Sequence, residues 1–275
     1  MNKRELGFRL IVAGLGIPAI MASVLLGKIW MCIVVILIEM LALFEFYQLF
    51  RKKGFSPNVP LGIGWIILIT LEIYFFELKY YIVILLGALF ICMIWEMFRN
   101  QSHPIVNVAL TLFGLNYLSL FSSLIFIRKF PGTAGFSRIT GGWLVMQIFF
   151  TIWLCDTAAY LWGSKFGKHR LFEKISPKKT WEGAIAGFLI SIPSALFIRF
   201  LFIPNTSIMH SIILGFIAGS FGQLGDLIES FIKRDAGVKD SSNLLPGHGG
   251  FLDRFDSPLI VAPLVYLSMK LFGIG

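Results

Sequence analysis

Nine long apolar stretches, separated by short polar segments, constrain the fold of this chain more than any other feature. A helix needs about 20 mainly apolar residues to cross the hydrocarbon core of a bilayer. The chain is 57% hydrophobic and 14% charged, so a soluble globule of 275 residues could not bury its apolar surface. Because the stretches do not alternate between apolar and polar residues, we predict an all-α, polytopic membrane protein with about nine transmembrane helices. The stretches lie at about 10–27, 30–50, 60–76, 80–98, 104–127, 140–162, 182–203, 207–232 and 256–273.

The basic residues indicate an orientation for these helices. With a cytoplasmic N-terminus, most of the 24 lysines and arginines fall on the cytoplasmic side, as the positive-inside rule expects. Arg128, Lys129 and Arg138 are exceptions, which leaves open a miscounted span near them. The first stretch also fits a signal peptide, but eight further stretches follow, so we interpret it as a retained helix. The chain has a net charge of +9, and its basic residues lie at the ends of apolar stretches. This placement favours anionic lipid or an anionic substrate, rather than nucleic acid, as the binding partner.

The two halves of the chain differ in their polar segments. Residues 1–150 have short loops, whereas residues 151–275 contain two longer polar segments, at about 163–181 and 233–255. Both longer segments are cytoplasmic in the predicted topology. We therefore predict an N-terminal hydrophobic helical scaffold over 1–150 and a C-terminal catalytic membrane region over 151–275.

The eighth apolar stretch carries a row of polar residues. Gln223, Asp226, Ser230 and Lys233 are spaced three, four and three residues apart, which places them on one face of a helix. A carboxylate inside a membrane helix is energetically costly and often marks a functional site. A purely structural ion pair, for example between Glu229 and Lys233, is the alternative for the acidic residues here.

The polar segment after this stretch combines glycines, acids and bases. Gly247, Gly249 and Gly250 would let backbone N–H groups approach phosphate oxygens closely. Asp253 and Asp256 lie three residues apart, and paired carboxylates suit Mg²⁺. Simple capping of a helix N-terminus is the alternative for Asp256. The combination predicts a metal and nucleotide-phosphate site, although the P-loop motif is absent.

The other polar segment is strongly basic. Six lysines and arginines lie between residues 165 and 179, where they could bind phosphate groups or simply follow the positive-inside rule. Ser176 and Pro177 predict a turn, and Thr180 with Glu182 predicts the start of the seventh membrane helix. Asp156 lies near the end of the preceding apolar stretch.

Two blocks of residues in this region resemble phosphatidate cytidylyltransferases. The longer block is Ser230-Phe-Ile-Lys233-Arg234, then Lys239-Asp240, then Pro246-Gly-His248-Gly249-Gly250-Phe-Leu-Asp253-Arg254-Phe-Asp256. The second comprises Asp156-Thr-Ala-Ala-Tyr160 and Ile175-Ser-Pro-Lys178-Lys179-Thr180-Trp-Glu182-Gly183. The resemblance is close over about 150–260, and elsewhere it extends only to length and hydropathy.

This resemblance implies a reaction and its setting. CTP and phosphatidate would give CDP-diacylglycerol and pyrophosphate, by metal-assisted attack of the lipid phosphate on the α-phosphorus of CTP. The resemblance also implies a homodimeric helical enzyme in the bacterial inner membrane, with its active site facing the cytoplasm. The expected cofactor is Mg²⁺, with a second cation left open.

The resemblance and the residue chemistry together assign roles to individual residues. Asp226 and Asp253 would hold the metal, with Asp256 as a further candidate ligand, and the catalytic residues would be Asp226, Asp253, Lys233 and Lys239. His248 is not needed as a base for an ionised phosphate, and a structural role is its alternative. The residues expected to contact substrate phosphates are Lys178, Lys179, Arg234, His248, Gly249, Gly250 and Arg254.

Two other functions compete with this interpretation. An ion-coupled transporter could use Asp156, Asp226 and Glu229 inside the membrane, but it would need two related halves, and we find no convincing repeat. A CTP-dependent lipid kinase would share the carboxylates and basic segments but would release CDP instead of pyrophosphate. The DGxxAR pattern of CDP-alcohol phosphotransferases is absent.

Overall fold

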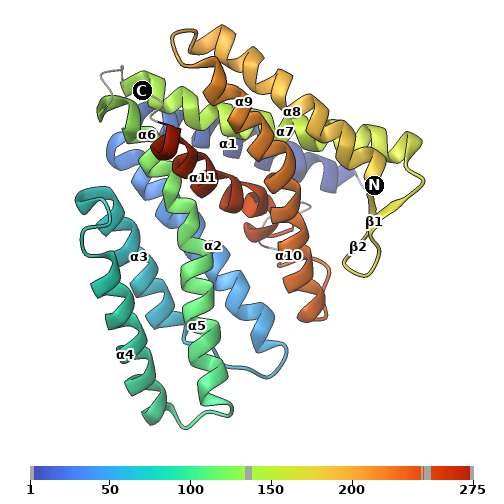
Figure 1. The fold of residues 1–275 in the computed structure, drawn as a ribbon. Helices are drawn as coiled ribbons and strands as arrows, with labels where there is room; N and C mark the ends of the chain where they lie inside the picture. Colours follow the sequence, from blue (N-terminus) through green and yellow to red (C-terminus); the bar gives the residue numbers. More distant parts are fainter. Residues whose placement is uncertain (1–2, 134–137, 243, 245–248, 273–275) are drawn as a thin grey trace. The chain divides into compact units, whose positions relative to one another are not determined.

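The computed structural model of the chain is almost entirely helical, as Figure 1 shows. It describes residues 3–133, 138–242, 244 and 249–272, with the side chains of these ranges except those of 3–13, 131–133 and 138. The elements are α1 (Lys3–Leu26), α2 (Lys28–Arg51), α3 (Val59–Phe76), α4 (Tyr81–Arg99), α5 (Pro104–Ser119), η1 (Leu120–Ser122), α6 (Ser123–Thr133), α7 (Arg138–Phe166), β1 (Arg170–Phe172), β2 (Ser176–Thr180), α8 (Trp181–Phe202), α9 (Ile208–Ile217), η2 (Ala218–Gly222), α10 (Gln223–Asp235) and α11 (Leu252–Phe272).

Eight helical segments of the described chain are long and apolar enough to cross a membrane. Each of the nine predicted stretches is helical in the structure. The first, in α1, contributes a shorter apolar helix over Gly14–Leu26, which accounts for the difference between nine and eight. Pro104–Phe130 forms a single candidate span, and the position of the basic residues near residue 128 relative to the membrane stays open. The predicted all-α, polytopic membrane architecture is confirmed.

The chain divides into two compact units, which we describe separately. The first unit contains Met1–Phe126 and Lys233–Arg254, and the second contains Ile127–Ile232 and Phe255–Gly275. Each unit therefore combines two separate segments of the sequence. The sequence analysis divides the chain differently, into a scaffold over 1–150 and a catalytic region over 151–275. That functional division stays a prediction.

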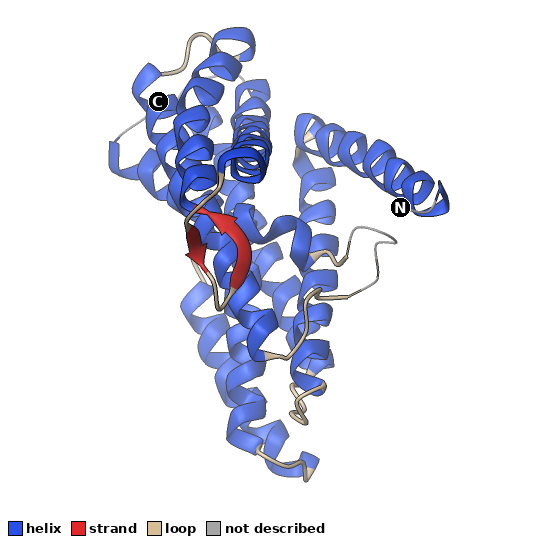
Figure 2. Cartoon of the chain, turned by 90° about the vertical axis from the view of Figure 1, so that its right-hand side faces the viewer, coloured by secondary structure: helices blue, strands red, loops and turns tan. Residues whose placement is uncertain are grey.

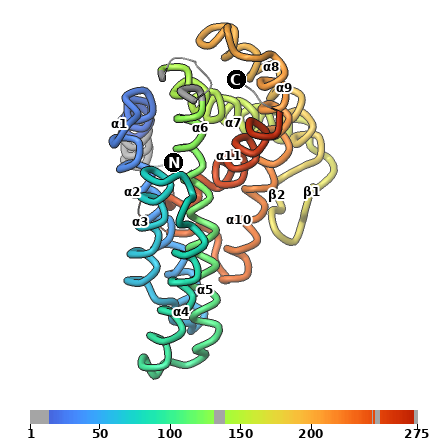
Figure 3. The backbone as a smooth tube through the Cα atoms, turned by 60° about the vertical axis from the view of Figure 1, so that its left-hand side comes forward, coloured from blue at the N-terminus to red at the C-terminus, as the bar shows by residue number. Residues whose placement is uncertain are grey.

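In the first unit, α2, α3, α4 and α5 pack side by side (Figure 3). Tyr47 of α2 is fully buried and donates a hydrogen bond from its hydroxyl to the Thr111 carbonyl oxygen of α5 at 2.8 Å. The carboxylate of Glu39 is also buried and accepts hydrogen bonds from Thr70 Oγ1 at 2.5 Å and Ser122 Oγ at 2.6 Å. These contacts satisfy polar groups inside an otherwise apolar bundle.

In the second unit, α7 and α8 pack closely because small residues line their contact. A Cβ atom at Gly183 would lie 2.6 Å from the Ala159 carbonyl oxygen, and one at Gly187 would lie 2.9 Å from the Cys155 carbonyl oxygen. Small residues spaced four apart allow membrane helices to approach backbone to backbone. This contact holds the C-terminal end of α7 and the N-terminal end of α8 together.

The span Ile208–Asp235 contains one turn of π-helix, η2, between α9 and α10. A π turn widens the helix and leaves backbone carbonyl groups without their usual partners. Gln223 Nε2 donates to the Gly219 carbonyl oxygen at 2.6 Å, and Ser257 Oγ of α11 donates to the Gly222 carbonyl oxygen at 2.9 Å. Side chains therefore donate hydrogen bonds to the carbonyl groups of this widened turn, and one of them links the turn to α11.

Between α7 and α8 the chain forms a short antiparallel hairpin of β1 and β2 (Figure 2). The predicted turn at Ser176 and Pro177 is wrong, because these residues begin β2 and the turn covers residues 173–175. Proline is tolerated at the start of an edge strand, where no ladder hydrogen bond needs its missing N–H group. The predicted start of the next helix is confirmed, since Thr180 Oγ1 accepts from the Gly183 backbone N–H at 3.3 Å.

Candidate active site

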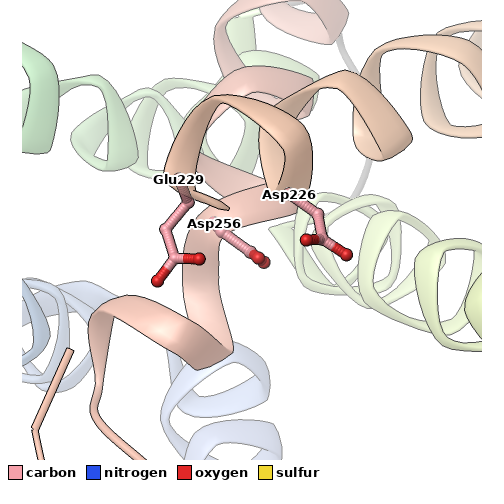
Figure 4. Close-up of side chains that lie close together, drawn as sticks. All are labelled: Asp226, Glu229 and Asp256. Carbon is pink, nitrogen blue, oxygen red and sulfur yellow. The ribbon is translucent and has the colours of Figure 1, made fainter. Parts of the chain in front are cut away.

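Three carboxylates gather in the second unit, two from α10 and one from α11. Asp226, Glu229 and Asp256 each offer an oxygen, and these oxygens lie within 4.8 Å of one another. Figure 4 shows the side chains of both helices extending into one region. Glu229 is buried, with 1% of its surface exposed, whereas Asp226 and Asp256 are partly exposed. We refer to these three residues as the carboxylate cluster.

Close packing of backbones brings the cluster together. A Cβ atom at Gly225 would lie 2.7 Å from the Asp256 carbonyl oxygen and 3.1 Å from Ser257 Cα, so only glycine allows α10 and α11 to approach this closely. The backbone N–H of Ser257 donates to Asp256 Oδ1 at 2.6 Å, which orients that carboxylate. The position of the cluster therefore depends on a glycine that immediately precedes Asp226.

A lysine of the hairpin contacts the carboxylate cluster directly. Lys179 of β2 places its Nζ 2.7 Å from Asp226 Oδ2, and its side chain is 25% exposed. Ser230 Oγ donates to the other carboxylate oxygen of Asp226 at 3.3 Å. Asp156 of α7 interacts electrostatically with both Asp226 and Lys179. Four acidic side chains thus share a small region, and Lys179 forms an ion pair with one of them, Asp226.

The composition of the cluster suits a divalent cation. Carboxylate oxygens are hard ligands of the kind that Mg²⁺ prefers, and several of them together repel one another unless a cation lies between them. The partial exposure of Asp226 and Asp256 leaves the site open to further ligands such as phosphate oxygens. The residues present therefore fit the metal that the sequence led us to expect, with Glu229 joining Asp226 and Asp256.

Asp253 belongs to a different set of contacts, within the first unit. Its Oδ1 lies 2.6 Å from Lys233 Nζ, and the two side chains are 7% and 12% exposed. Its Oδ2 accepts from Ser241 Oγ at 2.8 Å, from the Ser241 N–H at 3.1 Å and from the Gly250 N–H at 2.7 Å. Protein donors therefore surround this carboxylate, and its role as a metal ligand stays a prediction.

The remaining predicted residues are mostly at the surface. Lys178, Lys239, Arg234 and Arg254 have exposed side chains, and Arg234 Nη1 donates to the Val238 carbonyl oxygen at 3.0 Å. Their contacts with substrate phosphates stay predictions. The predicted residue His248 lies outside the described residues.

The two described glycines of the predicted phosphate loop have structural reasons to be glycine. Gly249 has a φ of +79°, in the left-handed region that favours glycine, and a Cβ there would lie 2.6 Å from Asp253 Oδ2. A Cβ at Gly250 would overlap Ser241 Oγ and the Glu45 carboxylate. The alternative of simple capping fits Asp253 better than Asp256, because α11 begins at Leu252 and Asp253 lies in its first turn.

Three residues are more prominent in the structure than in the sequence. The sequence leaves a functional and a structural role open for Glu229, although its spacing of three from Asp226 places it on a neighbouring helical position. Nothing in the sequence distinguishes Lys179 from Lys178, because the difference between them comes from the hairpin. Glu45 of α2 received no role, yet its buried carboxylate contacts the segment around Asp253. The sequence feature that could have pointed to Glu45 is the presence of an acidic residue within the apolar stretch 30–50.

Comparison with known proteins assigns the chain to a family. The family described as the cytidylyltransferase family has a model that matches residues 7–272. The chain belongs to the cytidylyltransferase family. This match spans both compact units and confirms the resemblance seen in the sequence.

Curated bacterial relatives match about half of the chain. A Staphylococcus haemolyticus protein named phosphatidate cytidylyltransferase is 44% identical over 133 residues, which is 48% of this chain and 51% of that protein. A Staphylococcus aureus protein of the same name is 47% identical over 135 residues, with the same two shares. The chain therefore spans about half the length of the curated relatives that it matches.

Proposed function

We propose that this chain is a phosphatidate cytidylyltransferase, which converts CTP and phosphatidate into CDP-diacylglycerol and pyrophosphate. The observation that carries the proposal is the carboxylate cluster with Lys179, held within membrane helices of a chain that belongs to the cytidylyltransferase family. The names of the staphylococcal relatives support the choice of substrates. The membrane setting suits a reaction in which one substrate is a lipid.

The chemistry needs little more than positioning and neutralisation of charge. A phosphate oxygen of phosphatidate forms a bond to the α-phosphorus of CTP, and the bond from that phosphorus to the oxygen of the β-phosphate breaks, releasing pyrophosphate. A divalent cation held by Asp226, Glu229 and Asp256 would neutralise phosphate charge at the site. Lys179, which is paired with Asp226, is close enough to the cluster to contact a phosphate group there.

The proposal includes an orientation and an assembly. The basic segments 163–181 and 233–255 support an active site at the cytoplasmic face of a bacterial inner membrane, by the positive-inside rule. The resemblance to phosphatidate cytidylyltransferases also supports a homodimer with CTP, phosphatidate and membrane lipid as its partners and with no role for nucleic acid. Mg²⁺ is the proposed cation, and the number of cations is part of what an assay must determine.

The test is a product analysis with purified full-length protein. The protein in lipid nanodiscs is given CTP labelled on the cytosine, phosphatidate and Mg²⁺. The proposal expects label in CDP-diacylglycerol and one pyrophosphate for each lipid product. Label in free CDP, together with a phosphorylated lipid, would identify a lipid kinase instead. Absence of any CTP turnover, in protein shown to be folded by its thermal transition, would overturn the proposal.

A further inference from the structure

The buried carboxylate of Glu45 is the starting point of the further inference. Glu45 lies in α2, within the region predicted to be a hydrophobic scaffold, and it is 1% exposed. It accepts four hydrogen bonds from residues about 200 positions later in the chain, all within the first unit. The donors are Ser241 Oγ at 3.1 Å, Ser242 Oγ at 2.6 Å, the Phe251 N–H at 2.9 Å and the Leu252 N–H at 2.8 Å.

Two of these donors belong to the beginning of α11. Leu252 is the first residue of α11, and the N–H groups at a helix N-terminus have no partners within the helix. A carboxylate at this position satisfies those donors and interacts favourably with the positive end of the helix dipole. Glu45 therefore caps the start of α11, although it comes from a helix remote in the sequence.

The contacts of Glu45 continue to Asp253 and Lys233. Ser241 Oγ lies between Glu45 Oε2 and Asp253 Oδ2, at 3.1 and 2.8 Å, and its one hydroxyl proton serves one carboxylate at a time. Asp253 in turn contacts Lys233 Nζ at 2.6 Å. Gly250 fits between Glu45 and Ser241 only because it has no Cβ.

We propose that Glu45 is a positioning residue for the cytidylyltransferase reaction, acting through Ser241 on the pair Asp253 and Lys233. This inference rests on the proposed function. Glu45 holds the segment that carries these two residues and the first turn of α11. It does not contact the substrate, so its loss slows the reaction by displacing Asp253 and Lys233.

The first test compares two buried glutamates of the same helix. Glu45→Gln keeps the size of the side chain but replaces one acceptor oxygen with a donor that opposes the N–H and hydroxyl donors. We expect kcat to fall roughly 10- to 100-fold, at temperatures well below the thermal transition. Glu39→Gln is the matched control, because Glu39 is equally buried and bonds Thr70 and Ser122 instead. It should keep kcat within about twofold of the unmodified protein.

The second test asks whether Glu45 acts through Ser241. If it does, Ser241→Ala alone lowers kcat, and adding it to Glu45→Gln lowers kcat no further, because the two changes break one set of contacts. Effects that multiply would show that the two residues act independently and would overturn the proposed route. Destabilisation of the fold as a whole would not produce this non-additivity.

The third test does not depend on activity or on complete folding of the variant. Hydrogen exchange at the Phe251 and Leu252 amides should be at least roughly 10-fold faster in Glu45→Gln, with no change in α3. Unchanged exchange at these amides, or a kcat equal to that of the unmodified protein, would overturn the inference. If the unmodified protein makes no CDP-diacylglycerol, the proposed function fails instead, which the product analysis shows separately.

Discussion

Two lysine–aspartate pairs in this protein look alike in isolation but differ in their surroundings. Lys179 and Asp226 in the second unit approach to 2.7 Å, and Lys233 and Asp253 in the first unit approach to 2.6 Å. Asp226 has two further carboxylates of the cluster beside it, and its side chain is 37% exposed. Asp253 is 7% exposed and accepts hydrogen bonds from backbone and hydroxyl donors.

The difference indicates which carboxylates need a cation. A carboxylate whose oxygens already accept several protein hydrogen bonds is stabilised in its charged form without any metal. Carboxylates that lie close together repel one another, and a cation or protons between them relieve this repulsion. The carboxylate cluster is thus the stronger candidate for binding and chemistry, and the group around Asp253 is the stronger candidate for positioning.

The largest effect should come from removing a charge in the carboxylate cluster. Asp226→Asn keeps the side-chain shape but removes the partner of Lys179 and one cation ligand. We expect CDP-diacylglycerol formation to fall by roughly 100-fold or more, with normal insertion and thermal stability. The measurement is turnover of the purified variant in nanodiscs. Turnover near that of the unmodified protein would show that the cluster has no part in the reaction.

The neighbouring lysines of β2 provide the next test. Successive residues of a strand point to opposite sides, and Lys179 contacts Asp226 whereas Lys178 is exposed. Lys179→Ala should lower kcat roughly 10- to 100-fold. Lys178→Ala should mainly weaken binding of CTP or phosphatidate, with a rise in KM of about twofold to fivefold. Equal effects of the two substitutions, in the same steady-state assay, would contradict the contact seen for Lys179.

Two glycines allow the packing around the carboxylate cluster to be compared with the packing around Asp253. A Cβ at Gly225 would meet the backbone of α11, which cannot yield, whereas one at Gly250 would meet the ends of side chains. We expect Gly225→Ala to cost about 2–3 kcal/mol of stability and Gly250→Ala about 1 kcal/mol. Thermal unfolding in detergent measures both. Gly64→Ala is the control, because nothing lies within 4 Å of a Cβ there. The unfolding temperature of this variant should not fall below that of the unmodified protein.

The sequence predicted the helices well because membrane helices require long apolar runs, which leave a clear pattern. It did not predict the hairpin of β1 and β2, where the paired strands are only three and five residues long. The π turn η2 was also missed, since its widened geometry depends on Gln223 and on Ser257, which lies 35 residues away from Gly222.

The sequence also predicted the part of the candidate site that lies on a single helix. The spacing of polar residues along the eighth stretch identified Asp226, because neighbours on one helix repeat at fixed intervals. The contacts of Glu45 join residues separated by 196 to 207 positions, and no periodicity in the sequence reports such pairs. Likewise, the sequence places Asp253 and Asp256 three residues apart, but only the structure shows how different their surroundings are.

Cation binding tests the central claim about the carboxylate cluster most directly. Mn²⁺ can replace Mg²⁺ and is detected by electron paramagnetic resonance, so binding is measured without any turnover. The account predicts that the purified protein binds Mn²⁺ and that Glu229→Gln and Asp226→Asn each weaken this binding roughly 10-fold or more. Mn²⁺ binding of equal strength in the unmodified protein and in both variants would contradict the account.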